Sequence, residues 1–374
     1  MLRDAWQIGR LFGIPLRVHV SWLIVFGLVS WSLAGGYFPA VLPDLPVWSY
    51  WAQAMVAAAM LFVSIILHEL GHSLVARHHG VGIASITLFV FGGVSQMKEE
   101  PRTPREEFQV AVVGPLVSLA LAGVFGGLGL LGQRGEGMTA STAVLLYLGG
   151  INLLLAIFNM LPVFPLDGGR VLRAALWHRR RNFAAATRTA ASVGRVFALG
   201  LMALGVLQLF AGRFGGLWLM LIGWFVMQAG AASARQASLR EALGELRVRD
   251  VMVTDPVTVR ADASVAELID GYVTRYTYGG YPVQRDGEVV GLVTLHDLRK
   301  VPRPEHAARR VDTIMTPLGP SLLVDPEASV FETFTRMVSG DAGRFVVADR
   351  GRVAGLITLN GILHLAQIRT SLGS

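Results

Sequence analysis

The sequence predicts an α-helical polytopic membrane protein with six transmembrane helices and a small β-hairpin, followed by a soluble α/β region. The 374 residues are 53% hydrophobic and only 16% charged, and the mean hydropathy of +0.51 exceeds that of ordinary soluble domains. Hydropathy then falls sharply after about residue 233, and an internal repeat follows. We therefore expect a membrane domain at 1–232, a linker at 233–245 and a soluble domain at 246–374.

Six apolar windows predict the six helices. Each has about 17 to 25 nearly charge-free residues, enough to cross a hydrocarbon core of roughly 30 Å. The windows are approximately residues 18–34, 51–76, 108–132, 142–161, 195–212 and 216–232. The first could instead be a cleaved signal peptide, because Arg3 and Arg10 precede it. Its long apolar run and the lack of a convincing small-x-small cleavage site favour a retained helix.

The basic residues lie in alternate loops. A net charge of +7 could indicate a nucleic-acid-binding protein. However, the loops at 1–17, 77–107 and 162–194 hold most of the basic residues of the membrane domain, whereas the other loops contain only Arg134 and Arg213. This positive-inside pattern predicts a multi-pass protein of the cell membrane with both termini in the cytoplasm. Its partner is then the lipid bilayer and no nucleic acid.

The second window ends in "LHELGHSLVA", which has the spacing of a zinc site. On a helix, His68 and His72 share one face, and Glu69 lies about 100° around the axis, close enough to handle a water at the metal. The chain has no cysteine, so only imidazole and carboxylate groups are available as zinc ligands. The alternative is a pair of structural histidines, but ionisable groups in a membrane helix are costly and usually functional.

Several residues could supply a third ligand. His78 follows His72 at a spacing used by one class of zinc proteases, but Val75 replaces the glycine that turns the chain in that class. Glu99 and Glu100 lie among basic residues and are typical of a solvated charge cluster. These three positions are therefore weaker candidates than a carboxylate further along the chain.

That carboxylate is Asp167 in "FNMLPVFPLDGGR". Pro162 and Pro165 interrupt helical hydrogen bonding, and Gly168 and Gly169 permit close backbone approach, so the carboxylate can leave the helix axis. The alternative is an ordinary proline-terminated helix with a Gly-Gly turn. By the charge pattern, the second and fourth windows run in the same direction, so both motifs reach the cytoplasmic side.

"HELGH" in an apolar helix, followed by "NMLPVFPLDGG", resembles the site-2 protease family of intramembrane zinc metalloproteases over most of residues 10–232. The resemblance implies one Zn²⁺ per chain with three ligands: His68, His72 and Asp167. It further implies that Glu69 is the general base and that Asn159 positions or polarises the substrate. Gly114 and Pro115 also match a family pattern, and we interpret them as helix packing or a kink.

The family resemblance implies a single-pass transmembrane protein as substrate, whose helix must unwind before its carbonyls can be attacked. "ITLFVFGGVSQM", residues 86–97, predicts a β-hairpin, and its edge could hold an unwound substrate by strand addition. A plain hairpin is the alternative. The candidate substrate-binding residues are Phe91, Gly92, Gly93 and Val94.

The soluble region contains two copies of one unit, at about 246–302 and 308–368. Each copy has a capping box followed by a turn-flanked strand pair. The boxes are Ser264 with Glu267 and Ser329 with Glu332; Gly291 with Gly355 and Thr294 with Thr358 share an offset of 64 residues. The two copies resemble a pair of CBS domains.

CBS pairs bind adenine nucleotides through a Thr/Ser-x-x-Asp ending. The first copy has Thr294 and Asp297, whereas the second has Thr358 but Gly361 at the aspartate position. The resemblance thus implies one working nucleotide site and one degenerate site. The alternative is a purely structural or dimerising module, with a homodimer formed through the CBS domains.

The predicted function is that of an intramembrane zinc endopeptidase that cleaves transmembrane substrate proteins and is modulated by its CBS pair. One alternative is a CBS-gated membrane transporter, which is disfavoured because matching halves with broken helices are absent from the sequence. Another is an inactive membrane scaffold. Replacement of Glu69 by glutamine separates these functions, because only the protease needs a general base.

Overall fold

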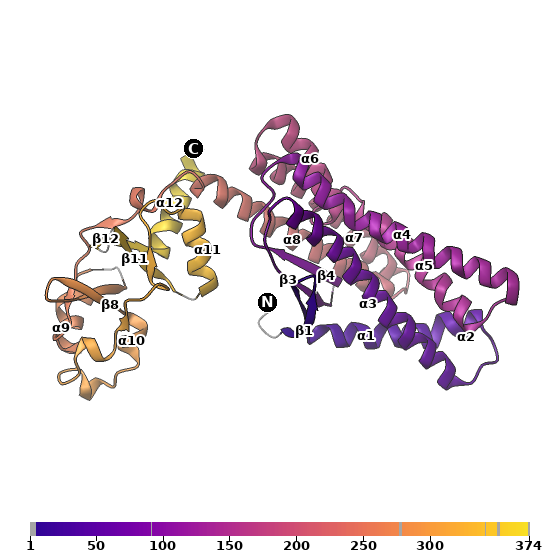
Figure 1. Cartoon of the computed structure of the whole chain (residues 1–374), viewed down its shortest axis with the longest axis horizontal. Coiled ribbons are helices and arrows are strands. Elements are labelled where there is room, and N and C mark those ends of the chain that lie inside the picture. The colour runs from indigo at the N-terminus through magenta and orange to yellow at the C-terminus, as the bar shows by residue number, and fades with distance from the viewer. Residues whose placement is uncertain (1–4, 91, 277–278, 341, 350–351, 373–374) are drawn as a thin grey trace. The chain divides into compact units, whose positions relative to one another are not determined.

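The computed structural model describes residues 5–90, 92–276, 279–340, 342–349 and 352–372. The chain divides into two compact units, Met1–Ala234 and Arg235–Ser374 (Figure 1). The first unit is mainly helical and the second is mixed α/β, as the hydropathy boundary predicted.

Within the described residues, six helical segments are long and apolar enough to cross a membrane, which confirms the predicted number. Most of these segments are longer than the hydropathy windows. The windows end where polar residues begin, whereas the helices continue through those residues. The segments are Ser21–Val41, Val47–His78, Pro104–Gly135, Ala140–Asn159, Phe183–Phe210 and Gly215–Leu243.

The first span consists of α1 (Ser21–Ser32), the π-helix η1 (Leu33–Tyr37) and α2 (Phe38–Val41). The other spans are the single helices α3 (Val47–His78), α4 (Pro104–Glu136), α5 (Ala140–Asn159), α7 (Phe183–Phe210) and α8 (Gly215–Leu243). Helix α3 contacts α1, α4 and α5, and is therefore the central element of the unit. The shorter helix α6 (Asp167–Arg180) packs against α4 and α7.

The predicted hairpin is present as β3 (Ile83–Phe89) and β4 (Gly92–Met97). It belongs to a larger sheet of order β1-β2-β3-β4, whose strands β1 (Ala5–Leu11) and β2 (Ile14–His19) lie in a segment that we had expected to be a loop. These short strands carry no hydropathy signal: β2 pairs in parallel with β3, and β1 pairs antiparallel with β2. The sheet packs on α3 and leaves β4 at its edge.

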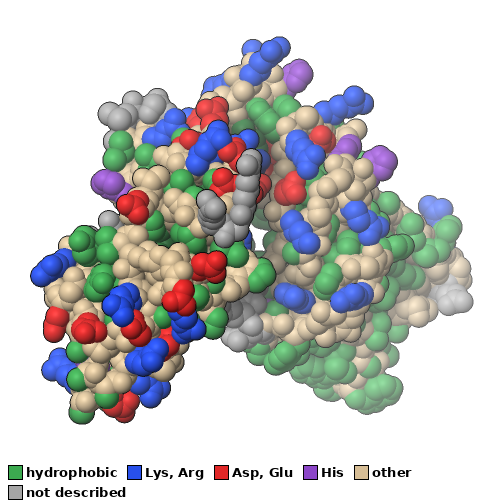
Figure 2. Space-filling view, turned by 60° about the vertical axis from the view of Figure 1, so that its left-hand side comes forward, with side chains coloured by type: hydrophobic (Ala, Val, Ile, Leu, Met, Phe, Trp, Pro, Cys, Tyr) green, Lys and Arg blue, Asp and Glu red, His purple; other side chains and the backbone are tan. Residues whose placement is uncertain are grey.

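The first unit has the surface expected of a membrane protein. Its exposed large apolar side chains include Leu28 of α1, Leu131 of α4, Leu154 of α5 and Leu207 of α7. In Figure 2, hydrophobic side chains gather over one end of this unit, and Lys and Arg side chains lie over its other part. Because lipid tails solvate apolar groups as well as a protein core does, these side chains require no protein partner.

The second unit contains two four-stranded sheets, one for each copy of the repeat. One has the order β6 (Val259–Arg260), β7 (Gly280–Arg285), β8 (Glu288–Thr294), β9 (Thr316–Pro317), and the other β10 (Leu323–Val324), β11 (Arg344–Asp349), β12 (Arg352–Thr358), β5 (Val253–Thr254). Each copy thus places its first short strand in the sheet of the other copy. This exchange makes the two copies one folded body.

Helices complete both copies at the positions that the capping boxes predicted. In the first copy, Ser264 and Glu267 form both reciprocal bonds at the start of α9 (Val265–Leu268). In the second, Ser329 Oγ accepts the Glu332 N–H at 3.5 Å before α11 (Val330–Gly340). The predicted linker, 233–245, lies largely within α8.

Candidate metal centre

Helix α3 places His68 and His72 on one face, and both are buried. Each Nδ1 atom meets a group on α4: His68 Nδ1 lies 2.9 Å from Ser118 Oγ, and His72 Nδ1 lies 2.6 Å from the carbonyl oxygen of Val110. A carbonyl can only accept a hydrogen bond, so Nδ1 of His72 carries the proton. Its Nε2 lone pair is therefore free to bind a metal.

Asp167 reaches the histidines through the loop between α5 and α6. The loop spans residues 160–166, and Asp167 is the first residue of α6. A Cβ atom added to Gly168 would lie 2.3 Å from the carbonyl oxygens of Met160 and Leu161, and one on Gly169 would lie 2.3 Å from the nitrogen of Phe164. The glycines therefore let the loop fold onto the first turn of α6. This fold aims the Asp167 carboxylate at α3.

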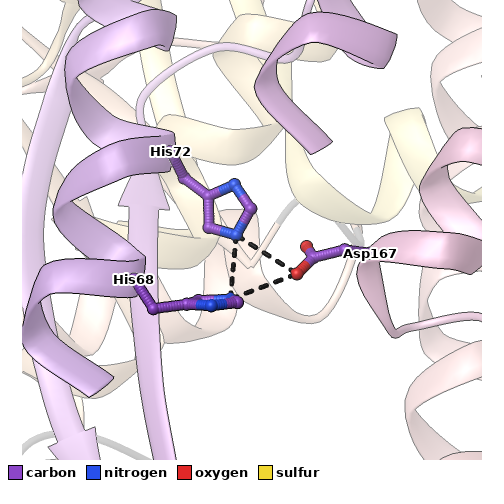
Figure 3. A group of neighbouring side chains, drawn as sticks. All are labelled: His68, His72 and Asp167. Carbon is purple, nitrogen blue, oxygen red and sulfur yellow. Dashed lines mark hydrogen bonds and ion pairs between the residues drawn. The ribbon is translucent and has the colours of Figure 1, made fainter. Parts of the chain in front are cut away.

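The three side chains form a nearly equilateral triangle (Figure 3). Asp167 Oδ2 lies 3.2 Å from Nε2 of His68 and 3.2 Å from Nε2 of His72, and the two Nε2 atoms are 3.2 Å apart. Ligand atoms about 2.0 to 2.2 Å from a tetrahedral zinc ion would lie roughly 3.3 to 3.6 Å from one another. The donor set therefore fits zinc in both its chemistry and its spacing.

The charge of the triangle also suits a cation. Burial raises the pKa of the Asp167 carboxyl, but the adjacent imidazoles of His68 and His72 and the positive charge of Arg170 outweigh burial and hold that pKa below its ordinary value. The carboxylate is thus ionised at neutral pH. Among the described residues, these three form the cluster of His, Asp and Glu side chains that could hold a metal ion.

The other candidate ligands lie elsewhere. His78 is exposed at the end of α3, where its ring meets that of His79 edge to face, with the ring centroids 5.5 Å apart. Glu99 is exposed and pairs with Arg102 at 3.0 Å. The structure thus brings Asp167, and neither of these nearer residues, to the two histidines.

A cavity of about 420 Å³ opens onto the triangle, and Glu69, Asn159 and Arg170 also line it. Glu69 Oε2 accepts the backbone N–H of Ser95, on the outer edge of β4, at 3.1 Å. The Asn159 amide donates to the carbonyl of Leu155 at 3.0 Å, within its own helix. Both predicted catalytic side chains therefore face the metal cavity.

The predicted substrate-binding residues Gly92, Gly93 and Val94 lie on β4 and line the same cavity, whereas Phe91 lies outside the described residues. A Cβ atom on Gly93 would lie 2.6 Å from Cγ of Glu69. Glycine at this position therefore lets the strand edge approach Glu69 closely.

Helix α4 supplies residues of the site that sequence reasoning missed. A Cβ atom on Gly114 would lie 2.2 Å from Nε2 of His72 and 2.7 Å from Nε2 of His68. Our interpretation of Gly114 as helix packing or a kink thus overlooked that it makes room for the metal centre. The available signal was periodicity, because Val110, Gly114 and Ser118 recur every four residues on one face.

A buried ion pair joins α4, which contacts both histidines, to α6, which begins with Asp167. The Arg173 guanidinium of α6 donates to Oε1 of Glu107 on α4 through Nε, at 2.7 Å, and through Nη2. The rings of Phe164 and Phe183 lie 4.8 and 4.7 Å from the guanidinium carbon. The pair therefore holds the helix that begins with Asp167 against the helix that contacts both histidines.

In the second unit, Thr294 and Asp297 cap α10 (Leu295–Arg299). Thr294 Oγ1 donates to Asp297 Oδ2 at 2.7 Å, and the Asp297 N–H bonds to Thr294 Oγ1 at 3.4 Å. In the second copy, Thr358 Oγ1 accepts the Gly361 N–H at 3.1 Å at the start of α12 (Leu359–Leu372). Both threonines thus mark helix starts.

The chain is similar in sequence to families of known proteins. The profile described as "Peptidase family M50" matches residues 56–135 and 133–201, and the profile described as "CBS domain" matches residues 248–303 and 311–367. A Mycobacterium tuberculosis protein named "Putative zinc metalloprotease Rip3" is 37% identical over 372 residues, which cover 98% of this chain and 94% of that protein.

A Synechocystis protein named "Putative zinc metalloprotease sll0528" is 34% identical over 371 residues, covering 96% of this chain and 95% of that protein. Among solved structures, "Site-2 Protease from Methanocaldococcus jannaschii" shares 31% identity. It covers 62% of this chain and 95% of its own, with a TM-score of 0.45.

Proposed function

The chain belongs to peptidase family M50, the site-2 proteases, and is a membrane-embedded zinc metalloendopeptidase with two CBS domains; on that premise we propose that it cleaves peptide bonds of transmembrane substrate proteins. The triangle of His68, His72 and Asp167 is the observation that carries this proposal. Its three donor atoms converge at distances that suit one zinc ion.

We assign the three vertices of the triangle as the zinc ligands. When bound, zinc supplies Lewis acidity that polarises the scissile carbonyl and acidifies a water. Ser118 and the Val110 carbonyl hold the imidazole rings so that their Nε2 atoms point inward. Such outer contacts fix the tautomer and orientation of a ligand histidine.

Glu69 is the proposed general base. It is next to a ligand histidine in the sequence and lines the same cavity, so its carboxylate can take a proton from the attacking water and deliver it to the leaving amine. Oε2 is held in place by the Ser95 N–H on the edge of β4. Asn159 lines the cavity from α5, where its amide can donate to the substrate carbonyl.

The edge of β4 is the proposed binding site for the substrate backbone. A transmembrane helix hides its carbonyls in its own hydrogen bonds, so a segment must unwind before cleavage. An unwound segment that adds to β4 along residues 92–94 would regain backbone hydrogen bonds beside Glu69. We infer that the substrate is a single-pass membrane protein.

The cell membrane is the proposed location, with both termini in the cytoplasm, as the charge pattern indicates. We further propose that the CBS pair modulates cleavage in response to an adenine nucleotide bound near Thr294 and Asp297. A bound ligand can do so only if its affinity differs between two conformations of the chain. A homodimer formed through the CBS domains is compatible with this role.

Glu69→Gln tests the proteolytic function. The variant should retain one zinc per chain, measured by mass spectrometry of the purified protein, and should lose cleavage of a co-expressed transmembrane substrate. Fragments that accumulate in wild-type cells but not in Glu69→Gln cells would identify that substrate by proteomics. Equal cleavage by the wild type and Glu69→Gln would contradict the assignment of Glu69 as the general base of a protease.

Cleavage of a membrane substrate by the purified, zinc-loaded full chain in detergent tests the nucleotide. Addition of ATP should change the cleavage rate of the wild type, and Asp297→Asn should abolish the change. Glu267→Gln alters the other capping box of the same copy and serves as the control. No effect of ATP on the wild type would leave the repeats as a structural module.

A further inference from the structure

A second cavity, of about 300 Å³, adjoins the metal cavity within the first unit, and we call it the apolar chamber. It lies among α1, α3, α5, α8 and the connection between β3 and β4. Every side chain that lines it is apolar; Val29, Phe62, Phe158, Trp218 and Ile222 are examples. The chamber is thus chemically unlike the metal cavity, which contains the titratable side chains.

The two cavities share a wall. Six residues line both of them: Ile65, Gly92, Phe158, Pro165, Leu166 and Phe225. Ile65 lies one helical turn before His68 and Glu69 on α3, and Leu166 immediately precedes Asp167. The chamber therefore begins within one turn of the proposed ligands and general base.

The position of Gly92 indicates what can enter. Gly92 opens the strand β4 and lines both cavities. In an extended peptide, successive side chains point to opposite sides. A peptide seated along β4 with its scissile carbonyl at the triangle therefore places one adjacent side chain on the side of the chamber.

The chamber is large enough for a bulky side chain. A cavity of about 150 Å³ lined by apolar side chains can hold benzene, and the chamber has about twice that volume. A large apolar side chain gains free energy by filling such a space, whereas a charged one would lose its hydration there.

We propose that the apolar chamber is a substrate subsite that takes a large aliphatic or aromatic side chain next to the scissile bond. The proposal rests on the proposed proteolytic function and adds the side-chain class that the protease selects. Ile222 of α8 is a specificity-determining residue of this subsite.

Ile222 offers a matched pair of variants. Ile222→Phe narrows the chamber, and Ile222→Ala widens it. Leu221→Phe places the same ring one position earlier on α8, where the side chain is 40% exposed and does not line the chamber. The purified, zinc-loaded full chain is incubated in detergent with a mixture of peptides from digested membrane proteins, and mass spectrometry of the new termini gives the residue preference at each position.

The wild type should favour Leu, Ile, Phe or Trp over Ala at one fixed position by about tenfold or more, the discrimination typical of an apolar pocket. Ile222→Phe should lower the preference for aromatic residues about tenfold, and Ile222→Ala should raise it. Leu221→Phe should leave the profile unchanged. Zinc content, measured in parallel, should not change in any of the three variants.

Two results would overturn the subsite. One is a wild-type profile without preference, and the other is a profile that Ile222→Phe and Ile222→Ala leave unchanged. A lipid acyl chain that co-purifies with the wild type and is lost from Ile222→Phe, without a change in profile, would assign the chamber to lipid. Failure of the wild type to cut any peptide, like Glu69→Gln, would instead remove the proteolytic function itself.

Discussion

The absence of one Cβ atom makes room for the candidate metal centre. Gly114 faces the Nε2 atoms of both histidines, and a methyl group there would occupy the space between them. Most glycines within helices weaken them by about 1 kcal/mol relative to alanine. Gly114 therefore lowers the stability of helix α4, but its missing side chain leaves the space that the two histidine rings occupy.

Gly114→Ala should abolish zinc binding, because the added methyl group would lie 2.2 Å from Nε2 of His72. Gly123→Ala on the same helix is the control, since its Cβ meets nothing within 4 Å. Zinc per chain and cleavage are measured for both. Full zinc content in Gly114→Ala would show that the rings can move aside and that the glycine is not needed for the metal.

Residue-level patterns predicted the candidate site only in part. His68, Glu69 and His72 were predictable because a helix has a fixed period, so four residues of spacing determine a shared face. Asp167 required the additional reasoning that prolines and glycines release the chain from a helix. For Val110 and Ser118, periodicity indicates only that they share a face with Gly114, and their roles depend on whether that face of α4 meets α3.

At the level of elements, α4 organises the site although it carries none of the proposed ligands. One face of this helix holds His72 through Val110, leaves space at Gly114 and holds His68 through Ser118. At its beginning, Glu107 binds Arg173 of α6. Helix α4 thereby contacts both α3 and α6, the helices that carry the proposed ligands, and holds them in position relative to each other.

Glu107→Gln should weaken this arrangement, because it removes one charge of a buried pair. Breaking such a pair costs roughly 3–5 kcal/mol, since the remaining charge stays buried without a counter-charge. Thermal unfolding in detergent should occur at lower temperature, and zinc should be lost more readily to a chelator. The exposed pair of Glu99 and Arg102 provides the control, because Glu99→Gln should cost at most about 1 kcal/mol. Equal stability of the two variants would contradict a structural role for the buried pair.

Among the elements, the long helices were predictable and the short strands were not. About 20 apolar residues are a strong signal because few other structures can satisfy their backbone in lipid. Strands β1 and β2 have seven and six residues, and β2 joins them to the sheet by pairing with β3, which lies far along the chain. No local sequence pattern could predict that pairing, because the two paired strands are far apart in the chain.

For the whole molecule, the basic loops predict its orientation in the membrane. The chain contains no cysteine, so single cysteines can be introduced and labelled without background. Arg181→Cys, between α6 and α7, should react only after the cytoplasmic side is opened. Arg213→Cys, between α7 and α8, should react in intact cells with a membrane-impermeant maleimide. The reverse pattern would invert the topology and place the soluble unit outside.

The sequence by itself determined the six spans, the repeated soluble unit, the two candidate zinc histidines and the family resemblance. Each is encoded by local composition, by a helical period or by a short motif, and needs no knowledge of distant contacts. The sequence favoured Asp167 as the third ligand, but only the tertiary structure showed that its carboxylate lies 3.2 Å from both imidazoles and that one face of α4 contacts both histidines. It also revealed the apolar chamber, whose walls come from helices far apart in the chain. A cavity forms where the side chains of neighbouring elements leave space between them. The sequence pattern of one segment does not contain this information, because it does not specify which segments pack together.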